Sequence, residues 1–195
     1  DRAMLVALDE VVRQTTDALE DFEYTTALER TERFFWVFCD DYVELVKQRA
    51  YDEANPASTQ SARLALRTAL SILLRLLAPF LPYSAEEAWS WWHTESVHTS
   101  PWPVPVTPVS GAAADNAEVI SLASAAIGAI RKAKSDAKRS MRVPVETVTI
   151  QGPAEKLDAI ASISSDLRAA GNVTTLQLEP GRDHELRIDV RLAEE

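Results

Sequence analysis

The chain has little of what most catalytic and metal sites need. Its 195 residues include one cysteine, Cys39, which excludes an internal disulfide and a cysteine-rich zinc site of the usual spacing. Only five glycines are present, and none forms a phosphate-cradling loop ahead of a helix, so both common glycine motifs for nucleotide binding are missing. The sequence therefore predicts no catalytic residue, no metal site and no cofactor in this chain.

Three histidines and one pair of adjacent carboxylates are the remaining candidates for chemistry. His93, His98 and His184 lack the spacing of metal ligands. Asp40 and Asp41 are neighbours on an expected helix, where their side chains diverge by about 100° and cannot share a water molecule as acid and base. We expect all five residues to be structural or solvent-exposed.

Long apolar runs are missing as well. The longest apolar stretches are broken by Arg67, Arg75, Pro79 and Pro82, and the first ten residues lack the charged-then-apolar order of a secretion signal. We therefore expect no membrane span, and a protein of the reducing cytoplasm. Apolar residues still make up 46% of the chain, which is enough to bury a substantial core.

Charge is plentiful but unevenly spread. The net charge is −10, and residues 1–60 carry 6 basic against 14 acidic side chains, which argues against general nucleic-acid coating. Residues 131–142, by contrast, hold six cations and one acid. Helical steps place Arg131, Lys134 and Lys138 on one face of that segment. The sequence predicts a cationic ridge there, which either grips RNA phosphates or docks onto a neighbouring protein surface.

Helical periodicity dominates the first hundred residues. Apolar residues recur at helical spacing over 5–19, 25–51 and 58–78. Ser84 followed by Glu87 predicts a capping box that opens a short fourth helix. Three long helices and a short one predict an antiparallel bundle over residues 1–100.

A run of prolines marks the expected domain boundary. Prolines at 101, 103, 105 and 108 exclude regular helix, so residues 101–114 are predicted to be an extended connection. Residues 115–195 then predict a helix from near Asp115, strands at 143–150, 173–178 and 186–192, and a helix through 157–167 that ends at Gly171. The expected fold is mainly α, an antiparallel helix bundle followed by a small α+β module of roughly βαββ order.

Two groups of surface residues each allow two interpretations. The first group recurs every four positions on the third helix: Arg63, Arg67, Ser71 and Arg75. It forms either a solvated face or a phosphate-contacting stripe. The second group consists of four tryptophans: Trp89, Trp91, Trp92 and Trp102. These either close the end of the bundle or stack on nucleobases.

Four stretches resemble one known family, in the family's order. Residues 38–47, FCDDYVELVK, resemble a helix of valyl-tRNA synthetases in which a tryptophan stands at the position of Asp41. Residues 74–89, LRLLAPFLPYSAEEAW, resemble class I synthetases for branched aliphatic amino acids. A Ser-Val-His to Trp-Pro element at 96–103 and the segment IRKAKSDAKRSMRVPV at 130–145 continue the resemblance.

The resemblance implies an anticodon-binding bundle, with its first helix expected upstream of this chain. It implies that tRNA(Val) is the partner, that Val43 packs against an anticodon base, and that Lys47 and Arg49 contact phosphates. Catalytic and editing domains of the same protein, with ATP and Mg²⁺ at the catalytic one, are expected upstream. The full-length protein would ligate valine to tRNA, whereas this chain alone is expected to be inactive.

Two alternatives stay open. An isoleucyl-tRNA synthetase would share the central motif, and its zinc-binding cysteines would be expected beyond Glu195. A free-standing helical module that binds protein and ignores RNA would share the bundle.

Overall fold

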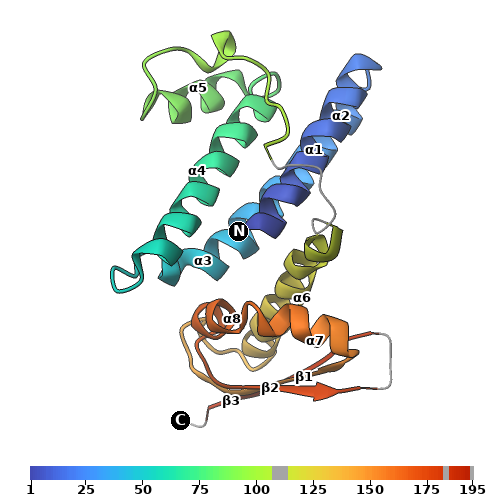
Figure 1. The fold of residues 1–195 in the computed structure, drawn as a ribbon, viewed down its shortest axis with the longest axis vertical. Coiled ribbons are helices and arrows are strands. Elements are labelled where there is room, and N and C mark those ends of the chain that lie inside the picture. The colour runs from blue at the N-terminus through green and yellow to red at the C-terminus, as the bar shows by residue number, and fades with distance from the viewer. Residues whose placement is uncertain (107–113, 182–184, 194–195) are drawn as a thin grey trace.

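The computed structural model describes residues 1–106, 114–181 and 185–193, with only the backbone described at 114–117. A helix bundle forms the first part of the structure (Figure 1). Its elements are α1 (Arg2–Glu20), α2 (Tyr24–Trp36), α3 (Val43–Ala50), α4 (Pro56–Leu77) and α5 (Pro82–Ser90), with a π-helical segment η1 (Val37–Tyr42) and a 3-10 turn η2 (Val97–Thr99). The predicted helix bundle is therefore present at the start of the chain, and His184 lies outside the described residues.

The expected helix 25–51 is continuous but changes its winding in the middle. The π-helical segment η1 joins α2 to α3 and brings Phe38 and Tyr42 into a stacked pair with ring centroids 6.0 Å apart. A π-helical turn accommodates one extra residue, so the apolar stripe of α2 does not continue in the same register into α3. The simple 3.6-residue period used for the prediction cannot reveal this change.

The second part is an α+β module, which we define as α6 (Ala114–Asp136) through β3. It contains β1 (Val145–Gly152), α7 (Ala154–Ala161), α8 (Ser164–Gly171), β2 (Val173–Pro180) and β3 (Arg187–Leu192). The strand order is β2-β1-β3, with β1 parallel to β2 and antiparallel to β3. Helices α6, α7 and α8 contact the sheet, as Figure 1 shows.

Three local predictions about helix ends were wrong. Ser84 is not an N-cap, because α5 already begins at Pro82, whose fixed φ suits the first helical position. The expected helix through 157–167 is broken into α7 and α8 by a turn at Ser162 and Ile163. Asn172, in the left-handed region at φ 53°, caps α8, whereas Gly171 is its last helical residue.

The described part of the proline-rich connection is pinned to the bundle. Arg75 donates to the Pro101 carbonyl at 3.2 Å, and Trp102 Nε1 donates to Thr16 Oγ1 at 2.9 Å. The backbone N–H of Val106 donates to the buried carboxylate of Asp9 at 2.8 Å. Residues 101–106 form no regular helix or strand, and these contacts hold them against α1 and α4.

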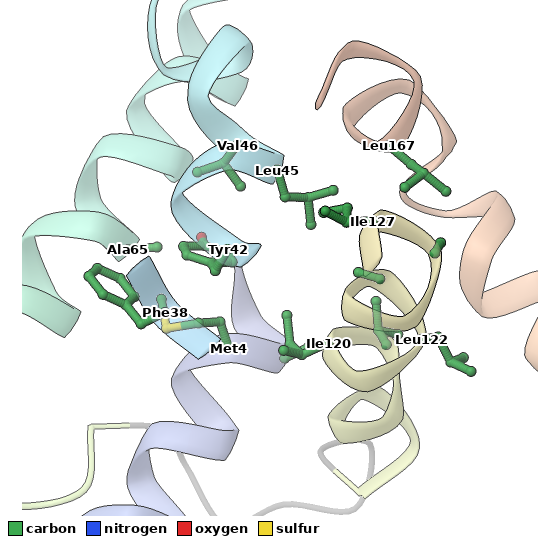
Figure 2. Close-up of a cluster of buried hydrophobic side chains, with 14 of the residues drawn as sticks. Met4, Phe38, Tyr42, Leu45, Val46, Ala65, Ile120, Leu122, Ile127 and Leu167 are labelled. Carbon is green, nitrogen blue, oxygen red and sulfur yellow. The ribbon is translucent and has the colours of Figure 1, made fainter. Parts of the chain in front are cut away.

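One hydrophobic core spans the bundle and the module. Helix α6 of the module packs against the bundle, and Figure 2 shows its Ile120 and Ile127 facing Met4 and Leu45 of the bundle. Leu167 of α8 packs on the other side of α6. The core therefore continues across the expected boundary at 101–114. No helix among the described residues is long and apolar enough to cross a membrane.

The four tryptophans differ in how deeply they are buried. Trp89 is buried in a small satellite core at the α5 end of the bundle, where His93 stacks on it at 3.8 Å. Trp102 is half-buried against the main core. Trp91 and Trp92 remain exposed. The bundle-closing interpretation thus holds for Trp89 and leaves Trp91 and Trp92 unexplained.

Candidate nucleic-acid interface

Two adjoining hollows lie where η1 and α3 meet α4. The first, which we name the tryptophan hollow, has a volume of about 510 Å³ and is mostly apolar. It is lined by Phe38, Val43, Leu66, Arg67, Leu70 and Trp92. The volume falls within the range of about 300–1,000 Å³ that is usual for small-ligand sites. An exposed indole and a guanidinium therefore flank an apolar depression.

The second hollow, the tyrosine hollow, has a volume of about 320 Å³. It is lined by Val43, Glu44, Lys47, Ala50, Tyr51, Arg63 and Leu66. Val43 and Leu66 belong to both hollows and form the wall between them. Tyr51 is 77% exposed. Each hollow thus offers an apolar floor, one exposed aromatic ring and at least one cation.

Helix spacing explains how these side chains meet. Val43 and Lys47 are one turn apart on α3, and Arg63 and Arg67 are one turn apart on α4, so each pair lies on one helix face. Arg63 is held by a 2.8 Å bond from its Nε to the Ala50 carbonyl. Lys47 makes an exposed ion pair with Glu44 at 3.0 Å, an interaction weak enough to be exchanged for a phosphate.

Arg49, expected to contact phosphate, is instead held between two carboxylates. Its Nε donates to both oxygens of Asp166, at 3.1 and 3.0 Å, and its Nη atoms donate to Asp1 at 2.8 Å. All three side chains are less than one-fifth exposed. Tyr42 adds a 2.6 Å bond to Asp1. In this arrangement Arg49 fastens α8 to the bundle.

Arg131 has a similar role on another face of the bundle. Its Nη1 pairs with Asp41 at 3.0 Å, and its Nη2 donates to the carbonyl of Asp40. This pair joins α6 to the π-helical segment. The aspartate that departs from the family's tryptophan is therefore the partner of a cation 90 positions later.

The predicted cationic ridge is not formed, because its three members separate. Lys134 is only 2% exposed, and its Nζ donates to the carbonyls of Met141 at 2.8 Å and Gly171 at 3.1 Å. Burial lowers the pKa of this ammonium group. Helix α6 ends at Asp136, so Lys138 lies beyond it in the left-handed region at φ 54°. Only Lys138 of the three is exposed without an ion pair among the described residues.

Groups with potential for acid–base or metal chemistry are not brought together. Among the described residues, no cluster of three His, Cys, Asp or Glu side chains could hold a metal ion. Cys39 is half-buried against the core, and burial raises the pKa of its thiol, which disfavours the nucleophilic thiolate. The arrangement supports binding rather than bond making.

A comparison of the sequence with known protein families gives a match. Residues 1–150 match the family described as the anticodon-binding domain of tRNA ligase. The chain belongs to this family. The match covers the whole bundle, the connection and α6, and it ends within β1, so the rest of the module lies outside the matched range.

Three relatives of this anticodon-binding domain are named valine–tRNA ligases. The chain is 50% identical over 193 residues to the valine–tRNA ligase of Thermobifida fusca, covering 99% of this chain and 22% of that protein. It is 47% identical over 187 residues to that of Salinispora tropica, covering 89% and 22%. It is 43% identical over 197 residues to that of Cutibacterium acnes, covering 100% and 22%. The chain thus spans about a fifth of the length of these relatives.

Only part of this candidate interface could be predicted from the sequence. The predicted site residues Val43 and Lys47 line the hollows, whereas Trp92 and Arg67 were singled out in separate groups. Tyr51, the exposed ring of the tyrosine hollow, was not among the predicted site residues, although it lies at a helix end beside polar residues. No spacing rule connects residues 43, 66 and 92, because their proximity depends on how α3, α4 and α5 pack.

Proposed function

We propose that the tryptophan hollow and the tyrosine hollow take unstacked bases of a tRNA anticodon loop. The observation that supports this most directly is the pairing, in each hollow, of an exposed aromatic ring with a cation beside an apolar floor. Single-stranded bases are held by stacking on aromatic rings, while nearby cations hold the backbone. Two hollows that share the wall of Val43 and Leu66 suit two neighbouring bases.

The sparse cations favour a specific loop over nucleic acid in general. The chain carries a net charge of −10, which opposes non-specific phosphate binding. Lys47, Arg63 and Arg67 are concentrated beside the hollows. Affinity must then depend on bases that enter the hollows, as recognition of an anticodon requires.

The test compares matched aromatic substitutions in the full-length ligase. Tyr51→Ala and Trp92→Ala should each raise the Kd for tRNA(Val) by about 5- to 150-fold, because loss of one base stack removes about 1–3 kcal/mol. Tyr83→Ala and Trp36→Ala remove rings that are 90% and 53% exposed but line neither hollow. These two controls should bind as the wild type does.

Filter binding with tRNA(Val) and with its isolated anticodon stem-loop provides the measurement. If Tyr51→Ala and Trp92→Ala bound both RNAs with unchanged affinity, the hollows would not be the base sites. If all four substitutions weakened binding equally, stacking in the hollows would not be the cause.

We also propose that the protein to which this domain belongs joins valine to tRNA(Val) in the cytoplasm. The relatives reported above are all named valine–tRNA ligases, which favours the valyl over the isoleucyl interpretation. Catalytic and editing domains, with ATP and Mg²⁺ at the catalytic one, would belong to the four-fifths of the relatives that this chain does not match. The 195-residue chain alone should show no valine-dependent pyrophosphate exchange, whereas the full-length protein should.

A further inference from the structure

Helix α6 ends in a turn whose geometry usually calls for glycine. The N–H of Lys138 bonds to the Ser135 carbonyl at 2.9 Å, and the N–H of Arg139 bonds to the Lys134 carbonyl at 2.8 Å. This pair of bonds is a Schellman motif, whose left-handed position is most often glycine. Here Lys138 occupies it at φ 54°. The turn therefore keeps a cationic side chain at a position where any side chain is strained.

We name residues 137–142 the basic turn. Hydrogen bonds from Lys134 and Asn172 fix its backbone. The buried ammonium group of Lys134 donates to the Met141 carbonyl within the turn and to the Gly171 carbonyl at the end of α8. Asn172 Nδ2 donates to the Arg142 carbonyl at 3.1 Å. These bonds fix the backbone of the turn against the module.

Three cationic side chains on and beside the basic turn are exposed to solvent. Lys132, Lys138 and Arg142 are exposed, and no ion pair among the described residues includes them. Arg139 differs, since its Nη1 bonds to the Ala193 carbonyl. Three cations are thus displayed on a backbone that is already ordered, which reduces the entropy lost when they bind an anion.

We propose that the basic turn and the adjoining end of α6 form a second RNA-binding surface, at which Lys138 and Arg142 of the turn and Lys132 of the helix contact phosphates of the tRNA backbone. This inference depends on the proposed tRNA-binding function but uses no residue of the two hollows. Met141 is the one large apolar residue exposed in the turn. A stable protein interface would need an apolar centre, whereas phosphate binding needs only accumulated cations. Lys134 is a positioning residue that holds the turn and does not itself contact RNA.

Salt dependence of tRNA(Val) binding to the full-length ligase tests the proposal. Each lost phosphate contact should lower the slope of log K against log salt by roughly 0.7 to 0.9. Lys138→Gly together with Arg142→Ala should therefore lower the slope by about 1.5. Lys138→Gly alone should lower it by about half as much and also raise the Tm, because glycine relieves the left-handed strain. Lys138→Ala should lower the slope equally without raising the Tm.

Lys134→Met tests the positioning role, since it keeps the length of the side chain and removes its donors. Amide hydrogen exchange in residues 138–142 should become faster, and the salt slope should fall although Lys138 and Arg142 are intact. Arg33→Ala, which removes an exposed cation of α2, should change neither quantity.

The outcomes separate this inference from the proposed function. If the double variant kept the wild-type salt slope while Tyr51→Ala still weakened binding, the basic turn would not contact RNA and the hollows would stand. If the double variant kept the slope but lost thermal stability in the full-length ligase, the turn would dock protein instead. Failure of the wild type to bind tRNA at all would overturn both.

Discussion

Arg49 and Asp166 are ion-paired through two bonds of 3.0 and 3.1 Å although 117 positions separate them in the chain. The pair joins α3 of the bundle to α8 of the module, two elements that periodicity alone assigns to different domains. Asp1 holds the other side of the same guanidinium. The bundle and the module are therefore linked by a shared cation as well as by a shared core.

Removing the cation should cost more than removing one of its partners. Arg49→Met leaves the carboxylates of Asp1 and Asp166 facing each other, so the free energy of unfolding should fall by about 3 kcal/mol. Asp166→Asn leaves Arg49 paired with Asp1 and should cost about 1–2 kcal/mol. Urea denaturation of both variants and of the double variant measures these values. Equal losses, or additive ones, would contradict a shared network.

Tyr42 should give the fold a specific sensitivity to alkaline pH. Burial, opposed by Arg49 and reinforced by Asp166, raises the pKa of its phenol far above the ordinary value near 10. The folded state therefore keeps the proton that the unfolded state releases. The resulting stability is fully present below pH 10 and is lost at higher pH, by about 1.4 kcal/mol at pH 11.

The check for Tyr42 is the fall in unfolding free energy between pH 9 and pH 11. This fall should be smaller in Tyr42→Phe than in the wild type. Tyr83→Phe, whose ring is 90% exposed, should decline as the wild type does. A Tyr42→Phe curve parallel to the wild-type curve would show that this phenol does not contribute.

Two glycines of the module should respond in opposite directions to alanine. A Cβ on Gly171 would lie 2.7 Å from Ile130 Cδ1 and 2.8 Å from Val173 Cγ2, so Gly171→Ala should destabilise the domain by about 1–3 kcal/mol. A Cβ on Gly128, inside α6, would meet nothing within 4 Å. Gly128→Ala should therefore stabilise it by about 0.5–1 kcal/mol. Thermal unfolding of the two variants would reveal any reversal of this order.

Phe22 should make the fold less stable than glycine would at the same position, because its backbone is left-handed. It occupies the left-handed position that ends α1, at φ 62°, with the N–H of Glu23 bonded to the Ala18 carbonyl at 2.7 Å. Phe22→Gly should raise the free energy of unfolding by about 1 kcal/mol. Phe22→Ala removes the same ring, which is 76% exposed, but keeps the strained Cβ. Equal stability of the two variants would mean that the ring, not the backbone, decides the effect.

The architecture could be predicted from the sequence because it follows from local periodicity. The bundle and the mixed helices and strands of the module appear as a change of hydrophobic period, and the prolines mark the connection between them. The π-helical turn could not be predicted, since one extra residue leaves no mark in composition. The burial of Lys134 could not be predicted from the sequence either. Its position on a helix is clear from the sequence, but its burial depends on Met141 and Gly171, which reach it only in the folded module.

The two hollows of the candidate interface could be predicted only in part from the sequence. Val43 and Lys47 were predicted from the family resemblance, and Trp92 was noted only as an aromatic residue. Arg49 was expected to contact phosphate from the family resemblance, and Lys134 was placed on a cationic face by helical spacing. Their real partners, Asp166 and the Gly171 carbonyl, lie 117 and 37 positions away, beyond the reach of any local pattern.

The strand order β2-β1-β3 leaves both outer strands with a single neighbour among the described residues. Open edges of this kind can pair with another copy of the same sheet and start aggregation. On β3, Arg187, Asp189 and Arg191 are all exposed, and β2 ends with Glu179 and Pro180. Alternating charge along one edge and a proline at the end of the other disfavour such pairing. The module thus carries its own protection against edge-to-edge association of copies.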